Sequence, residues 1–222
     1  MDLNELIAEI RDFEKVKDSL FVKLISADAQ GSFPDNVPYT PFLDMAAVYC
    51  LRPDGGDNSE AFIRITRQMI NEWGKCAEQL HDAAVYASEK RFPADIRPLQ
   101  DVLQTSFGFS CHGDAPAIYV VTNKSMMFGA SVILYPGIPE KIRKAVGGKY
   151  YLLPSSVHEF LAVPAETGMD PAELKKMVQE INATVVAPED RLSDGVYEYV
   201  EELNGNGPRI ERVVNVTEGN SF

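Results

Sequence analysis

The chain has 222 residues, 45% of them hydrophobic and 24% charged, which is ordinary for a globular protein with its own core. Its longest apolar runs are far shorter than the roughly 20 residues of a membrane-spanning helix. The net charge of −12 argues against broad contact with nucleic acid or an anionic membrane, because both depend on clustered lysine and arginine. The same charge permits a basic protein partner.

The cysteine spacing and the N-terminal residues indicate in which cellular compartment the protein is located. Three cysteines stand far apart without a Cys-x-x-Cys pair, so neither a disulfide framework nor a zinc ribbon is expected. The first fifteen residues mix acidic and apolar side chains at helical spacing and lack the basic start and apolar core of a secretory signal. A cytoplasmic location is therefore predicted.

The N-terminal part is predicted to be mainly helical. Apolar residues at helical spacing indicate a helix over residues 2–18, and the denser run 20–25 either continues it or forms an extended arm. Residues 44–52 are predicted as a strand between a proline-rich loop and a turn. Two consecutive helices should follow, the first capped by Ser59 and ended by Gly74.

Residues 93–116 contain three prolines and two glycines, and they are predicted to be a crossing segment with about one helical turn at 99–103. This segment is the expected boundary between an N-terminal part, 1–92, and a C-terminal part, 117–203. The last residues, 204–222, are predicted to be a flexible acidic tail.

The C-terminal part is predicted to alternate hairpins with helices. Two apolar runs, 118–122 and 129–135, read as strands around a polar turn, and 138–146 reads as a helix with a basic end and a Gly-Gly stop. Strands at 150–153 and 157–163 should flank a Pro-Ser-Ser turn. A helix capped by Asp170 and a last strand at 196–200 complete an α+β fold, with antiparallel hairpins backed by two helices.

None of the catalytic patterns is complete. His158-Glu159 lacks the second histidine of a metalloprotease motif, so no metal and no cofactor is predicted. Cys111-His112 suggests a nucleophile with a base, but such groups usually meet across a fold and not as neighbours in sequence. A hydrolase or transferase that uses Cys111, His112 or His158 therefore remains an alternative.

Polar residues in the predicted turns are the candidate binding residues. Asn123 follows the first strand of the C-terminal part, and Ser155, Ser156 and His158 lie in and after the Pro-Ser-Ser turn. A polar turn held between rigid strands is a favourable place for ligand contacts, although turn formation alone explains the two serines. These four residues are predicted as binding residues.

Several stretches resemble a known bacterial family, the domain of unknown function 5688. They include Trp73-Gly74, the run Tyr119–Asn123 with Gly129, and the segment from Leu153 to Glu159. The complete set is residues 41–46, 71–74, 78–84, 119–124, 129–130, 134–137, 153–159, 186–190 and 192–194. Lys75-Cys76-Ala77 departs from the family, where a capping Ser or Thr is expected. The resemblance implies a cytosolic protein and carries no activity or catalytic residue.

Acidity, a well-formed core and incomplete catalytic sets favour a non-enzymatic binding protein. One version is an immunity-like protein that neutralises a basic toxin. A small-ligand sensor is a third possibility, and it requires an apolar pocket between the sheet and the helical hairpin.

Overall fold

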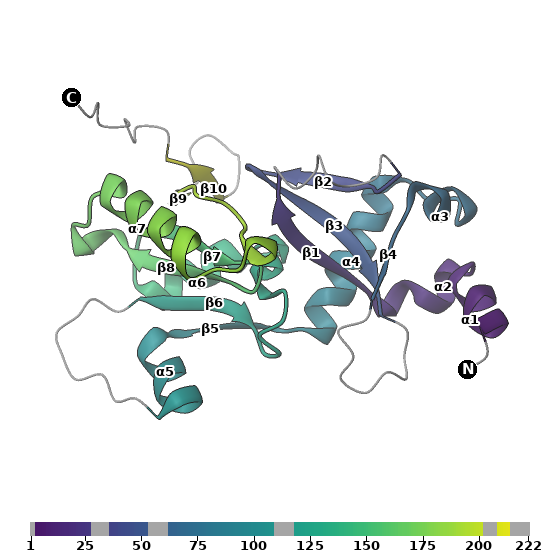
Figure 1. The fold of residues 1–222 in the computed structure, drawn as a ribbon, viewed down its shortest axis with the longest axis horizontal. Helices are drawn as coiled ribbons and strands as arrows, with labels where there is room; N and C mark the ends of the chain where they lie inside the picture. The colour runs from purple at the N-terminus through teal and green to yellow at the C-terminus, as the bar shows by residue number, and fades with distance from the viewer. Residues whose placement is uncertain (1–2, 28–35, 53–61, 109–117, 202–207, 214–222) are drawn as a thin grey trace. The chain divides into compact units, whose positions relative to one another are not determined.

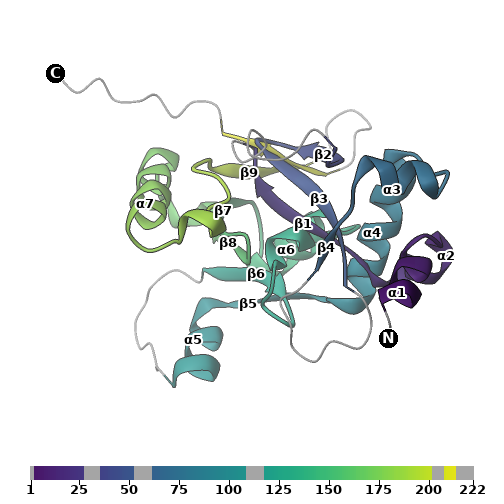
Figure 2. The same cartoon turned by 45° about the vertical axis from the view of Figure 1, so that its right-hand side comes forward.

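The computed structural model describes residues 3–27, 36–52, 62–108, 118–201 and 208–213. The chain divides into two compact units, residues 1–93 and 94–222, and each has its own antiparallel sheet. The sheets contain four and six strands within the described residues (Figures 1 and 2). The α+β class predicted from the sequence is confirmed, but the single strand expected in the N-terminal part is wrong.

The sheet of the first unit is built on the central strand β3 (Met45–Leu51), which is buried along its whole length. It pairs with β1 (Leu20–Ser26) on one side and with β2 (Tyr39–Phe42) and β4 (Ile63–Arg64) on the other. The apolar run 20–25, for which the sequence allowed either a continued helix or an extended arm, is thus part of strand β1. In β2, Pro41 lies opposite Ala46 of β3. The Ala46 amide faces β1, so Pro41 and Ala46 form a non-hydrogen-bonded pair, and the missing proline N–H removes no hydrogen bond to β3.

Helix α4 (Ala77–Arg91) packs on β1 and confirms the second helix of the predicted hairpin. Buried Ser88 accepts a hydrogen bond from the Val22 amide (2.9 Å) and donates to the Ala84 carbonyl (2.6 Å). Odd-numbered residues of β1 bond to β3, so the Val22 amide points away from the sheet. Ser88 therefore satisfies a buried donor on the outer edge of β1.

The first predicted helix is two helices, α1 (Leu3–Ile10) and α2 (Phe13–Val16), because Asp12 caps the second one through the Glu14 amide (3.1 Å). A short 3-10 helix, η1 (Lys17–Ser19), joins α2 to β1. Helix α3 (Arg67–Glu72) begins with Thr66 as its cap, whereas the predicted cap Ser59 lies outside the described residues. Trp73 donates to the Ile10 carbonyl (2.8 Å) and packs against Phe13.

The six-stranded sheet of the second unit has the order β10-β9-β7-β8-β6-β5. Its strands are β5 (Ala94–Pro98), β6 (Tyr119–Asn123), β7 (Tyr150–Ser156), β8 (Glu159–Pro164), β9 (Tyr197–Val200) and β10 (Arg209–Arg212). Helix α5 (Leu99–Phe107) confirms the helical turn predicted at 99–103 and is longer than expected. Strands β5 and β10 are corrections, because β5 lies in the predicted crossing segment and β10 in the predicted flexible tail. Pairing with β6 and β9 orders these two edge strands, which sequence periodicity does not reveal.

Residues 129–135 are the other correction, because they form a 3-10 helix, η3 (Gly129–Leu134), and not a strand. β6 consequently pairs with β5 and β8 instead of forming a hairpin. β7 and β8 do form the predicted hairpin, but its turn lies at Val157-His158, and Ser155 and Ser156 are the last residues of β7. Two further 3-10 turns are η4 (Ala165–Thr167) and η5 (Pro188–Asp190).

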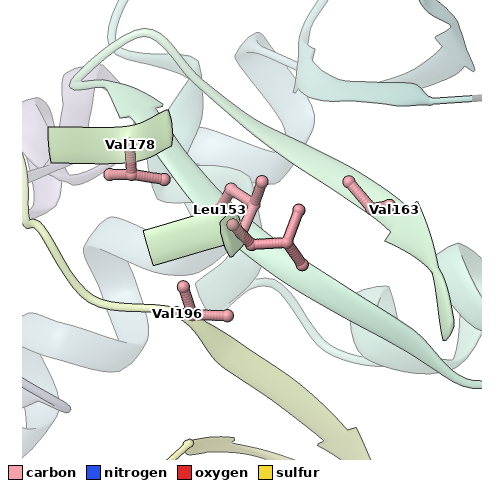
Figure 3. Close-up of a cluster of buried hydrophobic side chains, with 5 residues drawn as sticks. Leu153, Val163, Val178 and Val196 are labelled. Atoms are coloured by element: carbon pink, nitrogen blue, oxygen red, sulfur yellow. The ribbon is translucent and has the colours of Figure 1, made fainter. Parts of the chain in front are cut away.

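The two predicted helices of this part are confirmed and pack on opposite faces of the sheet. Helix α7 (Pro171–Thr184) starts at Asp170 and buries Leu174 and Val178 against Leu153, Val163 and Val196 (Figure 3). Tyr150 points to the other face because side chains alternate along β7, and its hydroxyl donates to Pro139 of helix α6 (Ile138–Val146; 3.0 Å).

Candidate functional site

The structure brings two of the four predicted binding residues, Asn123 and His158, onto one short loop, residues 124–128. Asn123 ends β6 just before this loop, and His158 lies in the β7–β8 turn. Both contact the backbone of residues that neither helix nor strand holds. We refer to residues 124–128 as the clamped loop.

The clamped loop has an unusual backbone. Met126 and Phe128 have φ angles of 55° and 51°, in the left-handed region that glycine favours. For a side chain with a Cβ this conformation costs about 1–2 kcal/mol per residue, so surrounding contacts must stabilise it. Asn123 and His158 supply such contacts, and the Phe128 carbonyl also accepts from the Ser131 amide (3.3 Å) and hydroxyl (2.8 Å).

Asn123 is buried and holds the first half of the loop. Its Oδ1 accepts from the Ser125 amide (3.0 Å) and the Ser125 hydroxyl (2.8 Å). Its Nδ2 donates to the Met127 carbonyl (2.9 Å), so one side chain fixes the backbone on both sides of Met126. The asparagine amide suits this role because it carries a donor and an acceptor.

His158 holds the second half. Its Nδ1 accepts a hydrogen bond from the Phe128 amide (3.1 Å), and the two rings stack with centroids 5.6 Å apart. Because Nδ1 is an acceptor, the proton of the neutral ring is on Nε2, which lies 3.6 Å from Asp190 Oδ1. The Asp190 carbonyl in turn accepts from the Val157 amide (2.8 Å), which fixes η5 against the turn.

Gly129 permits the close approach of the loop to the sheet. A Cβ on this residue would lie 2.5 Å from the His158 carbonyl oxygen and 2.8 Å from the Asn123 nitrogen, and closer still to Thr122 Oγ1. Thr122 itself donates to the His158 carbonyl (2.8 Å). Only glycine fits at this position without displacing backbone atoms.

The two predicted serines act on the turn and not on the clamped loop. Ser156 Oγ accepts from the His158 amide (3.1 Å), and Ser155 Oγ donates to Glu159 (3.1 Å). These bonds fix the position of His158, so their role is indirect. Asn123, Ser155, Ser156 and His158 thus stay predicted binding residues, and the contacts that they make are to the protein itself.

Exposed side chains of the clamped loop are Lys124, Ser125 and Met126. Met126 is 39% exposed, an apolar side chain presented to solvent on a fixed backbone. The loop is therefore a rigid, partly apolar surface next to the carboxylate of Asp190.

Sequence reasoning missed Thr122, Phe128, Gly129 and Asp190. The Phe128-Gly129 pair after a polar turn was the available signal for a close approach, but the apolar run behind it read as a strand. Asp190 lies 32 positions from His158 and only the tertiary fold brings it near.

The other residues considered for catalysis do not belong to the clamped loop. Cys111 and His112 lie outside the described residues. His81 is in the first unit, where its Nδ1 hydrogen-bonds the buried Tyr49 hydroxyl (3.0 Å), which also contacts Thr40. Burial raises the pKa of Tyr49, and it raises the pKa of the Cys50 thiol to about 12, so Cys50 is a poor nucleophile near neutral pH.

A second polar cluster lies on the α6 face of the six-stranded sheet. Glu140 accepts from Arg143 (2.9 Å) and from the Tyr199 hydroxyl (2.8 Å), and Tyr199 stacks on Tyr150. These bonds, first from Arg143 and then from Tyr199, lower the pKa of Glu140 to about 2. Burial, followed by the Glu140 hydrogen bond, raises the pKa of Tyr199 to about 12. Glu140, Arg143 and Tyr199 bond to one another and the Tyr150 hydroxyl donates to the Pro139 carbonyl, so the cluster fastens α6 to β9.

Within the described residues, the side chains that could bind a metal and one hollow can be assessed. No three His, Cys, Asp or Glu side chains converge there as a metal site would require. A hollow of about 430 Å³ in the first unit is lined by Asp18, Ala87, Lys90 and Arg91. Its walls are largely charged, unlike the apolar pocket expected of a small-ligand sensor.

Comparison with known proteins gives a family and no activity. None of the helices in the described ranges is long and apolar enough to span a membrane. The chain matches no curated protein and no solved structure. Residues 2–201 match the family of unknown function DUF5688, which confirms the resemblance seen in the sequence. The chain therefore belongs to this family.

Proposed function

We propose that this protein is a cytoplasmic, non-enzymatic binding protein that contacts a basic protein partner through the clamped loop. The observation that carries the proposal is the fixed left-handed backbone at Met126 and Phe128. A buried asparagine and a histidine hydrogen-bond the backbone around these two residues, so the loop presents a rigid surface. Rigid surfaces bind with a smaller loss of conformational entropy.

The contacts of His158 favour binding over catalysis. A general base needs a free ring nitrogen, but Nδ1 accepts from Phe128 and Nε2 faces Asp190. The histidine is therefore used to position backbone. Within the alternative, a hydrolase or transferase, use of His158 as a base requires its bond from the Phe128 amide to break before substrate is engaged. Use of Cys111 or His112 stays open, because both lie outside the described residues.

Charge supports a basic partner. The net charge of the chain is −12, although beside the loop the acidic Glu189 and Asp190 are balanced by the exposed Lys124 and Arg191. The preference for a basic partner therefore rests on the charge of the whole chain, which attracts a positively charged protein. An immunity-like role, in which the partner is a basic toxin, is the most specific form of this proposal.

The test is capture of a partner followed by a matched pair of variants. The purified protein is immobilised, partners are isolated from the native cytosol, and their affinity is measured for wild type, Met126→Asp and Met177→Asp. Met177 on α7 is 40% exposed, nearly the same as Met126, so it controls for surface charge and loss of an exposed methionine.

We expect Met126→Asp to weaken binding at least about tenfold while Met177→Asp leaves it unchanged. Binding should also weaken as salt is raised, because added salt screens attraction between exposed charges. Equal affinities of wild type and Met126→Asp would show that the clamped loop is not the binding surface. A salt-independent affinity would contradict a basic partner.

A further inference from the structure

We propose that His158 is a pH-sensitive latch, which holds the clamped loop while neutral and releases its Phe128 end when protonated. The biological consequence, loss of partner binding in acid, rests on the proposed function. The latch itself is a property of the folded protein alone. It follows from the contacts of the two ring nitrogens.

One nitrogen of His158 must stay unprotonated for the loop to be held. The Phe128 amide donates to Nδ1 across 3.1 Å, and an amide N–H is always a donor. Protonation turns Nδ1 into a second donor, so the two N–H groups face each other and the bond is lost. Imidazole changes charge within the physiological range, which makes it suited to such a switch.

The other nitrogen provides a partner for the protonated ring. Nε2 lies 3.6 Å from Asp190 Oδ1, and the Asp190 backbone is anchored to the turn through Val157. Other charged residues on the adjoining segments are Lys124 of the loop, Glu159 of β8, and Glu189 and Arg191 beside Asp190. Among these, Glu159 receives a bond from Ser155 and Arg191 donates to the Val186 carbonyl (3.3 Å). Asp190 thus faces Nε2, whereas the Phe128 amide faces Nδ1.

Release is expected to be local. Phe128 has a φ of 51°, and without the bond to Nδ1 its amide loses this hydrogen bond, while its carbonyl still accepts from the Ser131 hydroxyl (2.8 Å). Asn123 does not titrate and continues to hold Ser125 and Met127. The Phe128 amide should therefore exchange faster with solvent while β6, β7 and β8 remain paired.

The experiment follows Phe128 by NMR in the full-length ¹⁵N-labelled protein between about pH 7.5 and pH 5.5, a range that brackets histidine titration. We measure amide-exchange protection of Phe128 relative to Ala130, whose amide bonds to the Val157 carbonyl. Protection of Phe128 should fall about tenfold as the His158 ring becomes protonated, since one hydrogen bond is lost. His81→Asn serves as the control, because His81 lies in the other unit and its loss should not alter the transition.

A variant that cannot be protonated at this position makes the proposal refutable. In His158→Asn the side-chain oxygen takes the place of Nδ1 but cannot be protonated in this range, so Phe128 should stay protected at every pH. Constant protection of Phe128 across the pH range in the wild type, or the same loss of protection in His158→Asn as in the wild type, would overturn the latch.

This test is separate from that of the proposed function because it needs no partner. A working latch without a partner would refute the binding role alone. A partner whose affinity depends on Met126, combined with pH-independent protection of Phe128, would refute the latch alone.

Discussion

Replacing Gly129 with alanine tests whether the clamped loop depends on close approach to the sheet. The new Cβ would lie 2.5 Å from the His158 oxygen and 2.8 Å from the Asn123 nitrogen, both backbone atoms of the hairpin turn and of β6. Real Cβ contacts are essentially never below 3.0 Å, so the backbone itself must move. The φ of Gly129 is not in the left-handed region, so the effect reports space and not backbone strain.

The magnitude follows from two costs. Overpacking in a rigid environment costs about 1–3 kcal/mol, and separating Thr122 Oγ1 from the His158 carbonyl costs about 1–3 kcal/mol more if that carbonyl is left unpaired. We expect the free energy of unfolding to fall by about 4 kcal/mol. This is a large part of the roughly 5–15 kcal/mol that stabilises a typical domain.

The assay is urea unfolding followed by circular dichroism. The single tryptophan, Trp73, belongs to the first unit, so its fluorescence reports on that unit and circular dichroism is needed for the second. Gly148→Ala is the matched control, since its Cβ would meet Glu166 Oε1 at an ordinary 3.5 Å. Thr122→Ala in the Gly129→Ala background should recover only a minor part of the loss, because the two backbone contacts persist. Equal stability of Gly129→Ala and Gly148→Ala would refute the reasoning.

Three other predictions concern groups outside the clamped loop. Ser88→Ala should lower the stability of the first unit by about 1–3 kcal/mol in urea unfolding followed by Trp73 fluorescence, because it leaves the buried Val22 amide unpaired; an unchanged midpoint would contradict this. An alkylating reagent should modify exposed Cys76 rapidly in the native protein and Cys50 only on unfolding, because burial raises the pKa of Cys50 to about 12. Peptide mapping identifies the modified cysteines, and rapid labelling of Cys50 in the native protein would be inconsistent with that burial. The folded-state pKa of Glu140 is lowered to about 2, so the stability that its carboxylate contributes should be present above its ordinary pKa near 4.5 and be lost as pH falls toward 2. Glu140→Gln should reduce this loss of stability in acid when unfolding is measured against pH, and the same loss in both proteins would exclude the role of Glu140.

Local signals were sufficient where a single element determined its own structure. Helix α7 was predictable because Asp170 caps it and its apolar residues recur at helical spacing, and α6 because Pro139 and the Gly147-Gly148 pair mark its two ends. Strand β3 was predictable because a continuous apolar run stands between turn signals. These features depend on neighbours within about a dozen residues.

Errors arose where a distant segment decides the local structure. Residues 129–134 are as apolar as a strand, yet Gly129 must approach the backbone of Asn123 and His158, and the left-handed Phe128 before it directs the chain into a 3-10 helix. β10 was predicted as flexible because its own sequence is charged, and only pairing with β9 orders it. Tertiary context overrides local propensity in both cases.

The candidate residues show the same limit. Asn123 and His158 were predicted as binding residues because polar turns between strands favour ligand contact, and their proximity to one loop follows from the pairing of β6 with β8. Their side-chain bonds nonetheless end on residues 125–128 of the loop, so the proposed function assigns partner contact to the exposed Lys124, Ser125 and Met126 that they position. A polar residue in a turn can thus indicate a functional surface although it never touches the ligand. The distinction matters for mutagenesis: Met126→Asp alters the exposed surface itself, whereas His158→Asn changes how the backbone beneath that surface is held.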